Sequence, residues 1–137
     1  DDDTGDDDDT APPIAVSGTA TFDVFTDSGL FEEFECAGDV LASADVGAST
    51  LVGSGECLAD VQWWDIEVPF DFDCYLGQNT VVGLGRLYTD NVTQGIIDDI
   101  ELNVTGSYSE QGWDVSLVFQ GSDPSGVEVT GTATLTQ

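Results

Sequence analysis

The chain has 137 residues, of which 40% are hydrophobic, so it is long enough to form one domain with a buried core. It carries 28 acidic side chains, a single arginine (Arg86) and neither lysine nor histidine, which gives a formal net charge of −27. This balance excludes nucleic acid and anionic membrane surfaces as partners, because contacts with phosphate need lysine and arginine. Inorganic cations, basic proteins and neutral ligands such as glycans remain as candidate partners.

The first segment, residues 1–13, is acidic and of low complexity, and it ends in the sequence APP. We interpret it as a tether or extension that precedes a single domain over residues 14–137, because proline-containing spacers of this kind are stiff and extended. DDDTGD has glycine in the fifth place, whereas an EF-hand loop needs it in the sixth, and the RTX repeat pattern is absent too. The segment therefore lacks a defined metal loop. Its seven carboxylates are nevertheless candidate Ca²⁺ ligands, with a solvated tether as the alternative: Asp1, Asp2, Asp3, Asp6, Asp7, Asp8 and Asp9.

Alternating apolar and polar residues continue through almost all of the remaining chain. The alternation predicts eight strands, over residues 14–25, 31–44, 49–59, 64–76, 80–89, 100–108, 112–119 and 126–136. Turn sequences such as TDSG, LGQN and SDPSG separate them. Short connections favour an all-β antiparallel meander, which forms either a barrel or a two-sheet sandwich. Proline cannot donate in a ladder, so the strand that contains Pro69 is either bulged there or at an edge. A closed barrel has no edge, so Pro69 keeps the sandwich as an alternative.

The first and last predicted strands share a sequence pattern, since VSGTATF at 16–22 recurs as VTGTATL at 129–135. Threonine-rich alternation can recur by chance in a β protein. Otherwise the two strands occupy equivalent places beside each other where a barrel closes. A third interpretation is that the first strand pairs with a neighbouring molecule and takes the place of the last.

Three cysteines lie on the apolar sides of their strands: Cys36, Cys57 and Cys74. A turn at residues 45–48 would set Ala44 opposite Ser49, and hence Cys36 directly opposite Cys57, at a distance that suits a disulfide. We therefore predict a Cys36–Cys57 disulfide, which is typical of exported proteins. Cys74 would be a small buried hydrophobic residue, or else a free thiol or one half of an intermolecular bridge. The cysteines lack the C-x₂-C spacing of a zinc site.

Catalytic chemistry has few candidate residues. Without histidine the chain cannot form a Ser-His-Asp or Cys-His arrangement, and without lysine it cannot form a Schiff base. Paired carboxylates could hydrolyse a glycoside, but among so many acidic residues some pair will always look suitable. We predict that the protein is not an enzyme.

The polar side of residues 64–76 is a second candidate calcium site. Its carboxylates are Asp65, Glu67, Asp71 and Asp73. The alternative is a solvated face that discourages aggregation between strand edges. Trp63 and Tyr75 also fall on the outward side, where they are candidate contacts with a partner or glycan, unless they only cap the end of the core.

DDDTGDDDDTAPP, followed by an all-β domain, resembles the tether of bacterial envelope lipoproteins just after the lipidated cysteine. The resemblance is one of composition, and position 1 is Asp, not the cysteine that would carry the lipid. It implies an exported protein at the cell surface. The absence of methionine agrees with this, since it indicates a processed N-terminus. Because no stretch reaches the roughly 18 apolar residues of a spanning helix, we expect a mature protein that is extracellular or cell-surface and not transmembrane.

The expected function is that of a non-catalytic structural or adhesive domain. It would be a subunit of a multimeric, filament-like assembly in which cations or exchanged strands join the copies. The alternative is a barrel or sandwich that binds a small ligand or a glycan.

Overall fold

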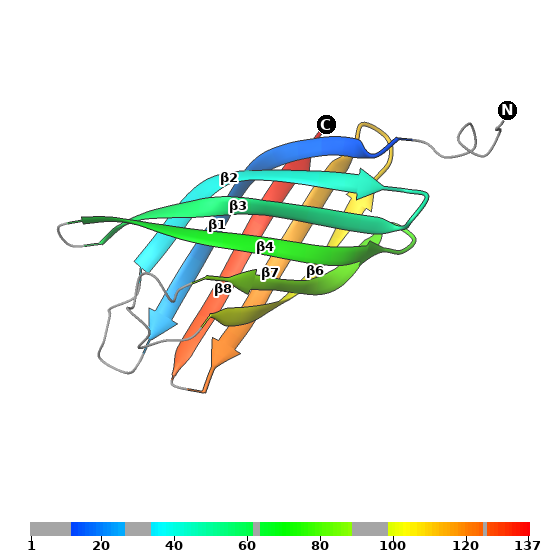
Figure 1. Ribbon diagram of the computed structural model, residues 1–137. Coiled ribbons are helices and arrows are strands. Elements are labelled where there is room, and N and C mark those ends of the chain that lie inside the picture. The colour runs from blue at the N-terminus through cyan, green and yellow to red at the C-terminus, as the bar shows by residue number, and fades with distance from the viewer. Residues whose placement is uncertain (1–11, 27–33, 62–63, 89–98, 125) are drawn as a thin grey trace, which may run out of the picture.

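The computed structural model is a closed antiparallel barrel of eight strands (Figure 1). The structure describes residues 12–26, 34–61, 64–88, 99–124 and 126–137. The strands are β1 (Ile14–Thr26), β2 (Phe34–Asp45), β3 (Thr50–Val61), β4 (Trp64–Leu76), β5 (Thr80–Leu87), β6 (Ile100–Ser109), β7 (Asp114–Asp123) and β8 (Val127–Thr136). Each strand pairs with the next in the sequence, and β8 pairs with β1. The predicted all-β meander is confirmed, and it forms a barrel and not a sandwich.

The strands that share a sequence pattern meet where the barrel closes. Ala20 of β1 lies opposite Ala133 of β8, Gly18 lies opposite Leu135, and Gly131 lies opposite Phe22. A Cβ atom on Gly131 would stand 2.5 Å from the Phe22 ring, so only glycine fits there. Each strand contains the pattern Gly-x-Ala-x-large, and the two strands run in opposite directions. A glycine therefore lies opposite a large side chain on both sides of the Ala20–Ala133 pair. The two strands occupy equivalent places beside each other.

Pro69 is compatible with the closed barrel because of its position in β4. On one side it lies opposite Glu56 of β3. Its carbonyl, on the other side, accepts a hydrogen bond from the Tyr88 backbone N–H at 2.9 Å, one residue past the end of β5 at Leu87. The missing proline N–H therefore faces a point where the β4–β5 ladder has already ended. Neither predicted alternative holds: Pro69 is not on an edge strand, and the β3–β4 pairing continues past it without a bulge.

The pairing of β2 with β3 differs from the predicted register by two residues. Ala44 lies opposite Leu51, not Ser49, because the turn occupies residues 46–49. Two hydrogen bonds hold this turn: Asp45 Oδ1 accepts from the Ala48 N–H at 3.0 Å, and the Val46 carbonyl accepts from the Ser49 N–H at 3.2 Å. Ser49 adopts a positive φ of 57°. The Cys36–Cys57 disulfide is nevertheless present, with a Cα–Cα distance of 5.3 Å. Continued from the Ala37–Leu58 pair, the regular register would offset the two cysteines by two residues.

The interior of the barrel is filled by apolar side chains. Phe22, Phe70, Phe72 and Phe119 form its centre, and the Phe119 ring centroid lies 5.1 Å from that of Phe22 and 5.8 Å from that of Phe72. All four residues are at most 1% exposed. An eight-stranded barrel is just wide enough for its side chains to fill it. The polar chemistry of the described residues therefore lies on the outer wall.

At one end of the barrel two aromatic rings stack, and one of them is hydrogen-bonded to the backbone. Trp113 follows Gly112, and both have positive φ, so β7 begins at Asp114 and not at residue 112 as predicted. The Trp113 ring stacks on Tyr108 with centroids 5.7 Å apart, and the Tyr108 hydroxyl donates to the Gly77 carbonyl at 2.6 Å.

Among the described residues, no helix is long and apolar enough to cross a membrane.

A groove on the outer wall as the candidate functional site

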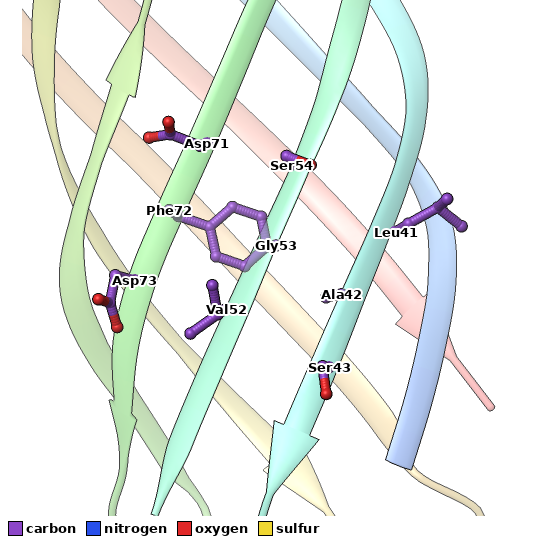
Figure 2. A pocket seen from close by; sticks show the side chains of 9 residues that line it. All are labelled: Leu41, Ala42, Ser43, Val52, Gly53, Ser54, Asp71, Phe72 and Asp73. Atoms are coloured by element: carbon purple, nitrogen blue, oxygen red, sulfur yellow. The ribbon is translucent and has the colours of Figure 1, made fainter. Parts of the chain in front are cut away.

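A shallow groove of about 620 Å³ crosses β2, β3 and β4 on the outer wall (Figure 2). The alternation of the three strands directs small polar, acidic and aliphatic side chains outward side by side. The groove is lined by Leu41, Ala42, Ser43, Val52, Gly53, Ser54, Asp71, Phe72 and Asp73. Its walls therefore combine aliphatic contact surface with hydroxyl and carboxylate oxygens.

Small residues on β2 and β3 set the depth of this groove. The Phe72 ring lies against Gly53, where a Cβ atom would stand 2.5 Å from the ring and 2.7 Å from the Cβ of Ala42 (Figure 2). Any larger residue at position 53 would force the Phe72 ring or Ala42 to shift. On the outside, Leu41 and Val52 rise beside the short side chains of Ser43 and Ser54 and are 71% and 48% exposed.

Asp71 is the most constrained carboxylate of the groove. It is half-buried, and its Oδ2 accepts a hydrogen bond from the Tyr88 hydroxyl at 2.6 Å. Arg86, the single arginine of the chain, lies directly opposite it on β5. The hydrogen bond to Asp71 raises the pKa of Tyr88; desolvation and the Asp71 and Asp99 charges add to the shift, whereas Arg86 opposes it. Asp71 is thus held in place before any ligand binds.

The other predicted acidic residues of β4 lie apart from one another. Asp73 is exposed at the groove between Val52 and Leu84. Glu67 is exposed opposite Leu58 and lines a second recess of about 380 Å³ with Gly38, Asp39 and Glu56. Alternate residues of a strand are about 6.7 Å apart. Within the described part of the chain, no group of three or more carboxylate or cysteine side chains is close enough to hold a metal ion.

Some predicted residues cannot be placed. Asp65 lies in β4 opposite Asp60, but its side chain lies outside what the structure describes. The seven aspartates of residues 1–9 and Trp63 lie outside the described residues as well. Tyr75 is placed, and its side chain points outward as predicted, with 73% of its surface exposed.

Cys74 is a buried free cysteine on the inner side of β4. Burial, with a smaller contribution from the Asp73 charge, raises the pKa of its thiol from the ordinary value of 9.0 to about 12. The thiol is therefore neutral at physiological pH. Because the folded-state pKa is above the unfolded-state value, this group stabilises the fold fully below pH 9.0, and its contribution is lost as the pH rises toward 12.

We expect Cys74 to resist thiol reagents in the native protein. At pH 8 the raised pKa leaves about a thousandfold less thiolate than an ordinary cysteine has, so labelling by a disulfide reagent should take hours, compared with seconds in guanidinium chloride. The Cys74→Ser variant provides the blank. Rapid labelling of one thiol in the folded protein would contradict the buried position.

The sequence did not indicate the partners of Asp71. Tyr88 and Arg86 come from β5 and the residue that follows it, and they reach Asp71 only through the β4–β5 register. The single arginine of so acidic a chain is expected to lie beside a carboxylate, but the sequence does not say which carboxylate.

Comparisons of this chain with protein-family models, with curated proteins and with solved structures returned no match.

Proposed function

We propose that the protein is a non-catalytic extracellular or cell-surface domain with a structural or adhesive role. The observation that carries this proposal is the division between a barrel interior packed with phenylalanine and an outer wall that bears the grooves and carboxylates. The disulfide supports an oxidising, exported location. A packed barrel held by a disulfide offers a rigid surface for contacts with other molecules.

The outer wall suggests how copies of the domain assemble. Ala11–Gln137 carries a net charge of −20, since seven of the 28 acidic residues precede it, so copies repel one another in the absence of counterions. Exposed carboxylates such as Glu67 and Asp73 are too far apart to chelate a metal within one copy. They can share a hard cation with carboxylates of a neighbouring copy, because Ca²⁺ takes six to eight oxygen ligands from flexible sites. Calcium would then act as a bridge between subunits.

Light scattering of the full chain tests this assembly. In about 5 mM calcium, near the weak end of extracellular calcium modules, we expect the mass to rise at least about twofold and to fall again with chelator. Sodium at matched ionic strength should not have this effect. The double variant Glu67→Gln/Asp73→Asn should assemble less, whereas the matched variant Glu128→Gln/Asp114→Asn, on β8 and β7, should assemble normally. A mass that stays monomeric in calcium would refute cation-bridged assembly, and deletion of residues 1–13 would show whether the tether contributes.

A ligand held inside the barrel is disfavoured by the packing of Phe22, Phe70, Phe72 and Phe119. The alternative function as a binding module therefore requires a ligand that binds outside the packed centre, at a mouth of the barrel or on the outer wall.

A further inference from the structure

An acceptor sequence for N-linked glycosylation lies in the middle of β6. Asn103, Val104 and Thr105 match the pattern Asn-x-Ser/Thr, in which the second residue is not proline. The chain has three asparagines, and two of them, Asn91 and Asn103, begin an Asn-Val-Thr sequence. Asn91 lies outside the described residues, so only the acceptor sequence at Asn103 can be placed in the fold.

The strand directs the two functional side chains of this sequence outward. Asn103 and Thr105 are exposed, whereas the side chain of Val104 between them is fully buried in the core. The Asn103 carboxamide therefore has room on the outer wall for a large substituent. A glycan attached there would extend into solvent and leave the packing of Val104 unchanged.

Three exposed aliphatic side chains surround the acceptor sequence. Leu84 of β5 lies directly opposite Asn103. Thr105 lies between Val82 of β5 and Val118 of β7. The three side chains are 52%, 58% and 41% exposed, and they are three of the nine large hydrophobic residues that are exposed among the described residues. The first sugars of a glycan on Asn103 would cover this apolar surface.

The closed barrel determines when such a glycan would be attached. Asn103 and Thr105 pair with β5 on one side and with β7 on the other, so a transferase cannot bind this backbone once both ladders have formed. The attachment must therefore precede closure, while the chain is being exported. Closure also requires β8, the last strand to be made, which leaves time for the transfer.

We propose that Asn103 is N-glycosylated, an inference that goes beyond the assembly of copies and rests on the exported location in the proposed function. In the transfer, the Asn103 amide nitrogen forms a bond to the anomeric carbon of a sugar that is carried on a polyisoprenyl phosphate or diphosphate. The bond between that carbon and the phosphate oxygen breaks, the phosphate leaves with the electron pair, and the amide nitrogen loses a proton. The Thr105 hydroxyl is required because the acceptor pattern needs a hydroxyl two residues after the asparagine.

Mass spectrometry of the protein isolated from the cells that naturally produce it tests this assignment. Cleavage after Glu101 and Glu110 releases residues 102–110, a peptide in which Asn103 is the only asparagine. We expect this peptide to carry the mass of a glycan in most copies of the protein. Fragmentation of the peptide should place the glycan on Asn103.

Variants expressed in the same cells separate the acceptor sequence from its surroundings. Thr105→Ala keeps the asparagine but removes the hydroxyl, so the glycan should be lost, whereas Thr105→Ser should retain it. Ser107→Ala, at the next outward position of β6, is the matched control and should stay glycosylated. Asn79 is an internal control that should stay unmodified, because it is exposed but is followed two residues later by Val81.

The outcomes distinguish the glycan from the exported location. An unmodified Asn103 in exported protein with the Cys36–Cys57 disulfide formed would overturn the proposal and leave the location intact. A glycan mass that persists in Thr105→Ala, or that occurs equally on Asn79, would overturn it as well. Reduced protein found inside the cell would refute the exported location and the glycan together. Calcium-dependent assembly is measured separately by light scattering, so its failure would leave this assignment standing.

Discussion

Replacing Phe119 with alanine is expected to lower the free energy of unfolding by about 3–5 kcal/mol. Phe119 is fully buried and its ring contacts those of Phe22, Phe70 and Phe72, so the truncation leaves a cavity where side chains of β1, β4 and β7 meet. A closed ladder can collapse only slightly into such a cavity. Urea denaturation followed by tryptophan fluorescence measures the change.

Val118→Ala is the matched control for this prediction. Val118 is the preceding residue of β7 and points outward, so its truncation should cost less than about 1 kcal/mol. Phe119→Leu, which removes less volume, should lie between the two. If Phe119→Ala cost no more than Val118→Ala, the interior would not be packed as described.

Loss of the Cys36–Cys57 disulfide is expected to lower the free energy of unfolding by about 3 kcal/mol, and the melting temperature by about 10 °C. The two cysteines are 21 residues apart, so the bond closes a loop of that length and lowers the conformational entropy of the unfolded chain. Calorimetry of the double variant Cys36→Ala/Cys57→Ala, compared with the parent, measures the change. Cys74→Ala, which keeps the disulfide, is the control.

Reduction of the parent should reproduce this loss. If the oxidised and reduced proteins melted at the same temperature, the disulfide would contribute nothing to stability. Intact mass and peptide mapping establish that Cys74 has not replaced one of the natural partners.

The strands were predictable because alternation has a period of two. In β4 the pattern correctly placed Phe70 and Phe72 inside and Asp73 and Tyr75 outside. Closure into a barrel was not predictable, because a sandwich has the same alternation. Whether the strands form a barrel or a sandwich depends on whether β1 and β8 can pair. The glycine pattern that they share supports this pairing only when the structure places Gly131 against Phe22.

The register between strands explains why the disulfide was predicted correctly and why the partners of Asp71 were missed. The β2–β3 register was wrong by two residues, and a shift of two leaves every side chain on its own face, whereas a shift of one would reverse them. Cys36 and Cys57 therefore stayed close despite the error. The contact of Tyr88 with Asp71 could not be inferred, because it depends on the exact register between β4 and β5.

The β1–β8 seam has a consequence for the order of folding. Gly18 and Leu135 lie near opposite ends of the chain, so the barrel cannot close until almost the whole sequence is available. Joining such distant segments carries a large loop-closure entropy and slows folding. Until then β1 presents an open edge that can pair with another chain. We expect the dense negative charge of the sequence to protect this intermediate, since it keeps unfinished chains apart during the slowest step of folding.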